Sequence, residues 1–243
     1  MKKIIIIPAR MQSVRFPGKV IYPIHGIPMV VRTAKCAQEV LGCDQVVVAT
    51  EDPQVVSVCA DWAISTIVTG AHHHNGTERC AEAARILGLE STDQVINLQA
   101  DLPHIQPDLL AEMFKFIPYY IMTAAVAVEG SPSTDANIVK VAMAWDQKAL
   151  WFSRKPIRSS ARVWYNHIGV YGFENKDLQQ YARLLVCDME LQESLEQMRI
   201  LYSMKRQIKV LITKEDCISV NVLSDLDKLN IYWPVGQVTG HVV

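Results

Sequence analysis

The residues best placed to do chemistry gather in a loop near the amino terminus. The stretch IIIIPARMQSVRFPGKV, residues 4–20, runs from four isoleucines into a loop that carries Arg10, Ser13, Arg15 and Lys19. Arginine offers a planar fork that matches phosphate oxygens, and lysine offers a point charge. The loop has neither the Walker A pattern GxxxxGK[ST] nor the GxGxxG fingerprint. We therefore predict a phosphate-binding loop of another kind, with a solvated basic loop as the alternative.

A second candidate is Asp101, which follows the apolar run that ends in NLQ at residues 97–99. A carboxylate at the carboxyl end of a strand is a ligand that Mg²⁺ prefers, commonly together with substrate phosphates. The alternative is an aspartate that caps the following turn. Because the cationic loop also follows a strand, we expect the two to face each other, which favours a metal ligand.

The third stretch is HHHNGTER, residues 72–79. Neighbouring side chains of an extended chain point to opposite sides, and no cysteine or carboxylate stands at zinc-ligand spacing, so we do not expect a metal site from the three histidines. We expect instead a loop that presents Asn75, Gly76 and Thr77, with Thr77 capping a helix and Arg79 in its first turn. Amide and hydroxyl groups there could contact a base or a sugar.

The elements that must position these residues follow an alternating pattern in the first half of the chain. We predict strands at residues 3–7, 45–49, 65–68 and 94–98, and helices at 29–41, 53–62, 77–87 and 107–116. Strands that alternate with helices are typical of parallel βαβ units. In open α/β sheets the ligand site lies outside the carboxyl ends of the strands, where the cationic loop and Asp101 would meet. The predicted fold class is α/β, with a doubly wound, mostly parallel sheet.

After the helix at 107–116 the pattern changes. Strand-like runs at 122–128, 139–143, 150–152 and 166–173 follow one another without full helices between them. This predicts a smaller, partly antiparallel β-containing subregion at about 120–175. Helices at 177–185 and 191–204, a strand at 208–212 and a terminal helix at 224–231 complete the prediction. No linker is long enough to divide the chain, so we expect residues 1–243 to form a single α/β domain.

The bulk composition narrows the classes of function. Half of the 243 residues are apolar, which is enough for a sizeable core, and the net charge of −1 gives no basic field for nucleic acid. The six cysteines form no CxxC pair, which favours reduced thiols. The amino-terminal apolar run is too short for a signal peptide or a membrane span. We expect a cytoplasmic protein with no nucleic-acid or membrane partner.

Six motifs, in order and spread over most of the chain, resemble those of the CMP-Kdo synthetases, the 3-deoxy-manno-octulosonate cytidylyltransferases. They are PARMQSVRFPGK, HNGTER, NLQAD.P, FSRKPI, HIGVYGF and LEQMR. The resemblance implies a cytidylyltransferase that joins CTP to an acidic 2-keto sugar, Kdo, to give the CMP-sugar and pyrophosphate for lipopolysaccharide biosynthesis. The resemblance also implies that residues 1–243 form a single α/β nucleotidyltransferase domain with a nucleotide-binding sheet. It further implies Mg²⁺ as the cofactor and a homodimer to which the smaller β-containing part contributes.

The resemblance assigns roles position by position. It implies catalytic roles for Arg10, Lys19 and Asp101. The nucleotide-binding set that it implies is Ala9, Arg10, Ser13, Arg15, Lys19, Asn75, Gly76, Thr77, Arg79 and Gln99. On the sugar side it implies Gln99, Arg158, His167, Tyr171, Glu196 and Gln197, and Arg158 is our candidate for the sugar carboxylate. The metal positions are Asp101 and Asn221.

The chain departs from the family pattern at several of these positions. Asn221 stands where the family has an aspartate that is its second metal ligand, so metal binding is expected to be weaker or shifted in preference. Ala100 replaces the glycine of a Gln-Gly-Asp sequence and adds a methyl group. Asn75 stands where the family commonly has serine, and the segment between Arg158 and His167 is short, so the identity of the acceptor stays open.

Three hypotheses on function follow from the sequence. In the first, the chain activates Kdo or a close analogue such as 8-amino-Kdo. In the second, it activates another nonulosonic acid in the manner of the CMP-sialic acid synthetases. In the third, it is a catalytically impaired nucleotide-binding relative that keeps the phosphate loop and lacks a metal ligand at Asn221.

Overall fold

The computed structural model describes residues 1–13, 15–157, 162–204, 206–215 and 217–229. The strands are β1 (Lys3–Pro8), β2 (Pro23–Ile24), β3 (Ile27–Pro28), β4 (Gln45–Thr50), β5 (Thr66–Val68), β6 (Gln94–Leu98), β7 (Ile121–Glu129), β8 (Lys140–Met143), β9 (Ala149–Ser153), β10 (Val163–Glu174) and β11 (Ile208–Thr213). The helices are η1 (Lys19–Ile21), α1 (Met29–Gln38), α2 (Pro53–Asp61), α3 (Gly76–Ile86), α4 (Pro107–Phe116), α5 (Asn175–Arg183), α6 (Asp188–Glu193), η2 (Ile200–Met204) and α7 (Asp225–Leu229).

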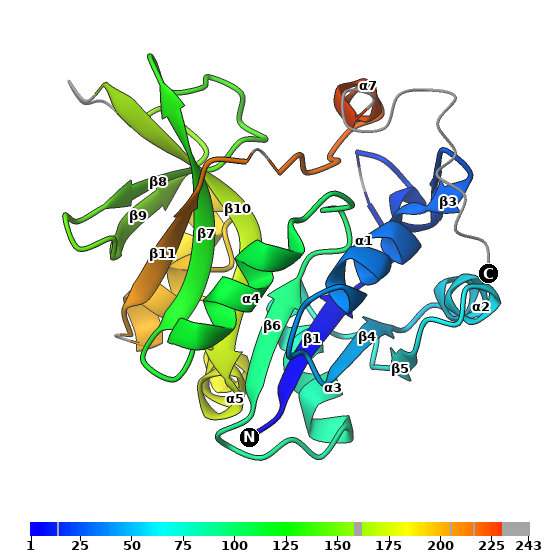
Figure 1. The fold of residues 1–243 in the computed structure, drawn as a ribbon. Coiled ribbons are helices and arrows are strands. Elements are labelled where there is room, and N and C mark those ends of the chain that lie inside the picture. Colours follow the sequence, from blue (N-terminus) through cyan, green and yellow to red (C-terminus); the bar gives the residue numbers. More distant parts are fainter. Residues whose placement is uncertain (14, 158–161, 205, 216, 230–243) are drawn as a thin grey trace.

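One twisted sheet forms the centre of the molecule, with the strand order β11-β7-β10-β6-β1-β4-β5 (Figure 1). The pairs β1–β4, β1–β6, β4–β5 and β7–β11 are parallel. Strand β10 lies antiparallel between β6 and β7, and β8 and β9 extend the sheet from it. The prediction of a mostly parallel α/β sheet with a smaller antiparallel part is confirmed.

The direction of β10 matters for the site. Val170 of β10 stands opposite Leu98, the last residue of β6. Because the two strands run in opposite directions, the part of β10 that precedes Val170 extends past the carboxyl end of β6. His167 therefore reaches the edge of the sheet at which Asp101 leaves β6.

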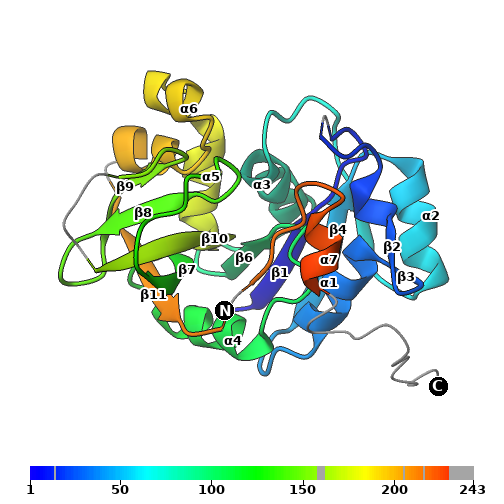
Figure 2. The same ribbon diagram turned by 90° about the horizontal axis from the view of Figure 1, so that it is seen from above.

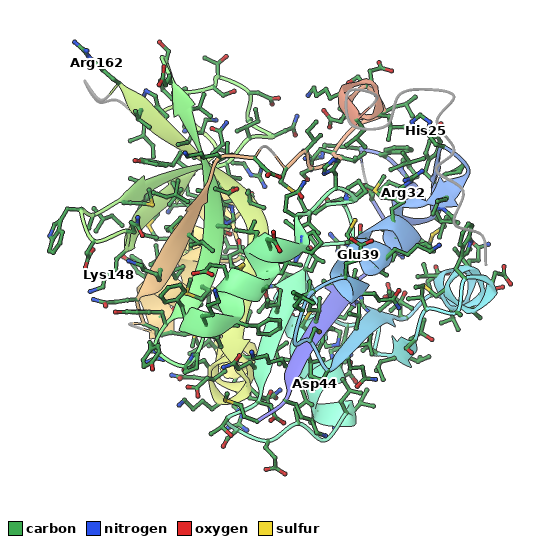
Figure 3. The ribbon with its side chains drawn as sticks, in the orientation of Figure 1. His25, Arg32, Glu39, Asp44, Lys148 and Arg162 are labelled. Atoms are coloured by element: carbon green, nitrogen blue, oxygen red, sulfur yellow. The ribbon has the colours of Figure 1, made fainter. Side chains whose placement is uncertain are left out.

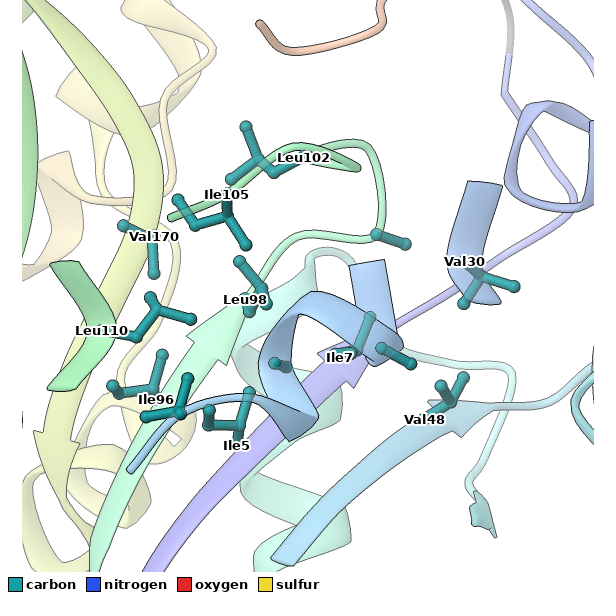
Figure 4. Close-up of a cluster of buried hydrophobic side chains, with 14 of the residues drawn as sticks. Ile5, Ile7, Val30, Val48, Ile96, Leu98, Leu102, Ile105, Leu110 and Val170 are labelled. Atoms are coloured by element: carbon teal, nitrogen blue, oxygen red, sulfur yellow. The ribbon is translucent and has the colours of Figure 1, made fainter. Parts of the chain in front are cut away.

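The four isoleucines of β1 are buried because helices cover both faces of the strand. Ile5 and Ile7 pack under α1 and α4, and Figure 4 shows them beside Ile96 and Leu98 of β6. Ile4 and Ile6 point to the opposite face, which α3 and α5 cover (Figure 2). A strand buried on both faces has a continuous apolar sequence instead of an alternating one. The strand also ends where the cationic loop begins, which fixes the loop at the carboxyl edge of the sheet.

The prediction of one helix at 191–204 is wrong. Helix α6 ends at Glu193, and Ser194 follows in the left-handed region with φ 53°. The chain then turns through Glu196 and Gln197 before the π-helical segment η2. A serine with positive φ is uncommon and gives no signal in a helical periodicity, because serine is tolerated in a helix. The break places Glu196 in a turn, from which it reaches the start of α3.

Helix α7 lies near the end of the described chain. The predicted helix at 224–231 is present as α7, and its last two residues fall outside the described part of the chain.

Lys148 and Arg162 project from the antiparallel part, away from the edge where β1 and β6 end (Figure 3). Among the described helices, none has both the length and the apolar character that crossing a membrane requires.

Candidate active site

A cavity of about 690 Å³ opens at the carboxyl ends of β1 and β6. It is bounded by the cationic loop, the start of α3, the loop after β6, the turn after α6 and the segment before α7. Of the residues predicted for the site, those that line it are Arg10, Ser13, Arg15, Lys19, Asn75, Gly76, Gln99, Asp101, Glu196 and Asn221. Ala9 is buried behind the cavity, where its N–H donates to the carbonyl of Ala49 over 2.9 Å.

Lys19 links the cationic loop to the candidate metal carboxylate. Its Nζ donates to Asp101 Oδ2 over 2.6 Å and to the carbonyl of Val220 over 2.9 Å. The backbone N–H of Val220 in turn donates to the carbonyl of Asp101 over 2.9 Å. Gly18 has φ 71° at the start of η1, a conformation that glycine adopts without strain. This turn directs Lys19 into the cavity. The cationic loop, the loop after β6 and the segment before α7 therefore meet at the Lys19 ammonium group.

Arg15 makes the corresponding link to Asn221. Its Nη2 donates to Asn221 Oδ1 over 2.9 Å, and its Nη1 contacts Asn137 Oδ1. The Asn221 amide nitrogen donates to Ser219 Oγ over 3.2 Å, which fixes the orientation of the amide. The backbone N–H of Asn221 donates to Asp225 Oδ2 over 2.9 Å. The Asn221 oxygen is thus turned toward the cations of the loop.

The oxygens of Asp101 and Asn221 fit a hard divalent cation. Each already accepts a hydrogen bond from a cationic side chain, and the Lys19 ammonium lies between the Asp101 carboxylate and the Val220 carbonyl. Mg²⁺ is commonly bound through one or two carboxylates together with waters and substrate phosphates. The protein supplies one carboxylate and one amide oxygen for such an ion, so substrate phosphates would provide most of the negative charge around it.

The start of α3 is capped by Asn75, whereas the sequence analysis expected Thr77. Asn75 has extended backbone, and its Oδ1 accepts from the N–H of Glu78 over 2.9 Å, which satisfies one of the free amides of the first turn. Its side-chain nitrogen donates to Tyr181 Oη over 3.0 Å. Gly76 then begins the helix at the cavity wall, and a Cβ there would lie 2.8 Å from Gln99 Nε2. The glycine permits this close approach of the helix to Gln99.

Thr77 lies just inside the wall and is 2% exposed. Its hydroxyl accepts from Asn97 Nδ2 over 2.9 Å and donates to Glu196 Oε1 over 3.1 Å. Asn97 also accepts from Gln99 Nε2 over 3.1 Å. A hydrogen-bonded chain therefore joins Gln99 to Glu196 through two buried side chains.

Glu196 has an unusual environment for a carboxylate. Burial raises its pKa to about 7, although the hydrogen bonds from Thr77 act in the opposite direction. Arg199, a cation whose charge acts to lower the pKa of Glu196, is engaged by Glu190 over 2.6 Å and by Glu78 over 2.9 Å. Glu196 is therefore partly protonated near neutral pH and can donate as well as accept in the cavity.

Arg79 and Gln197 are buried behind the cavity and do not line it. Arg79 is 3% exposed and forms an ion pair with Glu51 over 2.5 Å, and it also donates to Thr69 Oγ1 over 2.6 Å. Gln197 is 2% exposed and follows Glu196 in the turn. Their positions support the walls that carry Asn75 and Glu196, and direct contacts with a ligand stay predictions for both.

A second cavity of about 460 Å³ adjoins the first on the side of β10. Both cavities are lined by Gln99, Asp101, Arg154 and Asn221. The second cavity also contains His167, whereas Tyr171 is buried next to it with its ring centroid 5.5 Å from that of His167. Asp101 therefore stands at the boundary between the two adjoining cavities.

His167 is a neutral group in this cavity. Its Nε2 lies 2.8 Å from Thr123 Oγ1, and that hydroxyl also lies 2.8 Å from the carbonyl of Val170. Because the hydroxyl has a single hydrogen, both contacts are satisfied when Nε2–H donates to Thr123 and Thr123 donates to Val170. Burial lowers the pKa of His167 to about 3, so the imidazole stays uncharged at neutral pH.

Arg154 is the residue that the sequence analysis missed. It lines both cavities, and its guanidinium donates to the carbonyls of Ala136 over 3.0 Å and Ser194 over 3.2 Å. Its position in the FSRKPI motif, directly after β9, was the signal that could have identified it. Arg158, which we had selected from the same region, lies outside the described residues.

Comparison with known proteins shows the family of the chain. The family described as "Cytidylyltransferase" matches residues 4–208. The 3-deoxy-manno-octulosonate cytidylyltransferases of Helicobacter pylori (strain HPAG1) and of a Nitratiruptor species are 39% and 36% identical, over 95% and 93% of this chain and 98% of each relative. Among solved structures, a CMP:2-keto-3-deoxy-manno-octonic acid synthetase complexed with CTP superposes with a TM-score of 0.86 at 30% identity, covering 96% of this chain and 98% of the other. The chain is a nucleotidyltransferase and belongs to the 3-deoxy-manno-octulosonate cytidylyltransferase family.

Proposed function

We propose that this protein transfers the cytidylyl group of CTP to 3-deoxy-manno-octulosonate, or to a close analogue such as 8-amino-Kdo, and releases pyrophosphate. The observation that carries the proposal is the position of Asp101, which lines both the cationic cavity and the adjoining one on β10. A nucleotide held by the loop cations and a sugar acid held beside His167 would meet at this carboxylate. The names of the relatives and the CTP complex of the similar structure support the same pairing of substrates.

The chemistry needs positioning and charge neutralisation more than covalent catalysis. The anomeric hydroxyl of the sugar attacks the α-phosphorus in line and loses its proton to solvent. A new oxygen–phosphorus bond forms, and the bond to the bridging oxygen breaks as pyrophosphate leaves. Arg10, Arg15 and Lys19 bind the phosphates and neutralise the charge that grows on the leaving group. Ser13 and the Gln99 amide, which line the same wall, provide neutral hydrogen bonds.

We propose Mg²⁺ as the divalent metal, held by Asp101 Oδ2 and Asn221 Oδ1. When bound, the ion would neutralise phosphate oxygens and orient them for displacement. The chain's own part is an exchange of partners: Lys19 leaves Asp101 and Arg15 leaves Asn221, and both cations turn to the phosphates. The free protein thus keeps its two candidate metal ligands and its phosphate-binding cations paired with each other.

We propose that the second cavity holds the sugar acid. Arg154 is a cation at its wall and suits the carboxylate of the sugar, while the neutral His167 and the amide of Asn137 suit hydroxyl groups. Contacts with the sugar stay predictions for Arg158, Tyr171 and Gln197.

We also propose that the β-rich part at about 120–175 forms the interface of a homodimer. We propose further that the enzyme works in the cytoplasm, in lipopolysaccharide biosynthesis.

A panel of acceptors tests the proposed reaction. CTP and Mg²⁺ are incubated with the full chain and, separately, with Kdo, 8-amino-Kdo and a sialic acid, and pyrophosphate release is measured. Release with Kdo or its analogue supports the proposal. Release with the sialic acid alone would assign another nonulosonic acid as the acceptor. Binding of CTP by calorimetry without release with any acceptor would favour the impaired relative, which the neutral amide of Asn221 motivates.

A further inference from the structure

The loop between β5 and α3 brings together three side chains that the proposed reaction does not use. The nearest ligand atoms of His72, His73 and Glu82 all lie within 4.8 Å of one another. His73 Nε2 lies 2.5 Å from Glu82 Oε2, and the ring centroids of the two histidines are 4.3 Å apart. An extended loop, as predicted from residues 72–79, would not bring these side chains together. The chain bends at Ala71 instead, and Glu82 approaches from the helix.

We propose that His72, His73 and Glu82 form a binding site for a borderline divalent transition-metal ion, of which Zn²⁺ is the representative. Two neutral imidazoles and one carboxylate are a donor set that Zn²⁺ takes, with its remaining position open to water. Mg²⁺ prefers oxygen ligands, so the same donors discriminate against the ion proposed at Asp101. The cluster is therefore a second metal site, chemically distinct from the one in the cationic cavity.

The surroundings hold the three ligands in place. Glu82 Oε2 also accepts from the N–H of Gly70 over 2.8 Å, and the side chains of His73 and Glu82 are only 7% and 18% exposed. Second hydrogen bonds of this kind orient metal ligands in proteins. The ring of His72 is seated over Gly70, because a Cβ at residue 70 would lie 2.5 Å from its Nδ1 and 3.5 Å from Glu82 Oε2. The missing side chain at Gly70 leaves the room that His72 occupies beside the carboxylate.

Charges near the cluster are compatible with a bound cation. The guanidinium of Arg85 lies 3.7 Å from Glu82 Oε1, but its side chain is 69% exposed and free to turn into water. Arg79, a second cation that interacts electrostatically with Glu82, already forms an ion pair with Glu51 over 2.5 Å.

Metal binding here would act on the wall of the nucleotide cavity. His74, the next residue after the cluster, lines that cavity together with Asn75 and Gly76. Glu82 lies on α3, the helix that Gly76 begins. An ion at the cluster would tie the loop to its own helix and stabilise the native chain. We therefore expect Zn²⁺ to raise the thermal midpoint of the free protein.

The test uses the full chain without a histidine tag, in buffer with millimolar Mg²⁺ as a competitor for oxygen ligands. Zn²⁺ binding is measured by calorimetry and by thermal unfolding. We expect one ion per chain to bind tightly enough to raise the midpoint by several degrees. The variants His72→Gln, His73→Gln and Glu82→Gln should each weaken binding by about tenfold or more. Because His72 is exposed, its substitution leaves the packing of the loop intact.

Two matched controls each remove one imidazole or one carboxylate away from the cluster: His104→Gln, just before α4, and Glu112→Gln, within α4. Both should leave the Zn²⁺ affinity unchanged. All five variants should keep the Mg²⁺-dependent reaction in the absence of Zn²⁺. Equal affinity in the wild type and in the three cluster variants would overturn the proposal, since binding would then come from other groups such as the partly exposed thiols. Absence of saturable binding at submillimolar Zn²⁺ would also overturn it.

Discussion

Lys19 and Asp101 form an ion pair of 2.6 Å between the cationic loop and the carboxyl end of β6. The pair is partly buried, with side-chain exposures of 13% and 22%, so solvent screens it less than a surface pair. It holds the lysine at the position where a divalent cation would sit beside Asp101. The Lys19–Asp101 ion pair therefore organises the free site, and it must separate when metal and nucleotide bind together.

Substituting Asp101→Asn tests the carboxylate directly. We expect the rate of pyrophosphate release to fall by about 100-fold or more, which corresponds to ~2.7 kcal/mol of lost transition-state stabilisation, because the charged metal ligand is removed. Asp108→Asn, in the exposed first turn of α4, is the matched control and should react at the wild-type rate. A variant at Asp101 that keeps the wild-type rate at all Mg²⁺ concentrations would contradict the assignment.

Asn221→Asp adds a second negative charge at the metal site. We expect the Mg²⁺ concentration for half-maximal rate to fall about tenfold, or ~1.4 kcal/mol, because a hard cation gains a charged oxygen. The control Asn137→Asp places a carboxylate on the same Arg15 but outside the pair of proposed ligands. If both variants shifted the Mg²⁺ dependence equally, the effect would belong to Arg15 and not to a metal ligand.

Gly76→Ala tests the close approach of α3 to the cavity wall. The added methyl would lie 2.8 Å from Gln99 Nε2 and 3.0 Å from Pro8 Cγ, so Gln99 must move. We expect about tenfold weaker CTP binding by calorimetry, with little change in the thermal midpoint. Gly169→Ala is the control, because its Cβ would meet Gln99 Cγ at an ordinary 3.7 Å. Equal CTP affinities in the two variants would show that the displacement of Gln99 has no consequence for the nucleotide.

Glu196→Gln tests the raised pKa of this carboxylate, about 7 in the folded chain against an ordinary 4.5. Since the folded state binds the proton more tightly, the wild type loses stability as the pH rises from about 4.5 through 7. The amide cannot ionise and can still accept from Thr77. In urea unfolding we expect the variant to be more stable than the wild type at pH 8, by up to about 3 kcal/mol.

The comparison at lower pH completes that test. Below pH 4.5 the wild-type carboxyl is protonated in both states, so the advantage of the variant should vanish there. Glu112→Gln, at a partly exposed carboxylate of α4, should show no such pH-dependent difference. An equal stability difference at pH 4 and pH 8 would mean that Glu196 is not protonated on folding.

The sequence predicted the elements whose signal is local. The isoleucines of β1 and the cations that follow it indicated both the buried strand and the site at its end. The break at Ser194 was missed because it depends on one dihedral angle that the periodicity of residues 191–204 does not carry. The cap at Asn75 was placed two residues late, because asparagine and threonine are both good caps and only the structure distinguishes them.

Contacts between segments that are distant in the sequence could not be predicted from local patterns. Arg154 was missed because the motif contains several cations, and only the position of β9 beside the turn at Ser194 selects one of them. The cluster of His72, His73 and Glu82 depends on a bend in the loop and on a helix that returns to it. No spacing rule for a short motif contains that information. The pairing of β10 with β6, which brings His167 to the site, is likewise a property of the sheet and not of either strand.

The hydrogen bond between Arg15 and Asn221 joins residues that are 206 positions apart in the chain. Closing a loop over such a span costs more chain entropy than forming a local βαβ unit, so we expect the candidate active site to be among the last parts of the molecule to be completed. During synthesis the phosphate loop emerges long before the segment that carries Asn221, and a ribosome-bound chain lacking that segment holds Lys19 and Asp101 without their Val220 partner. Recovery of enzymatic activity on refolding should accordingly lag behind recovery of the sheet.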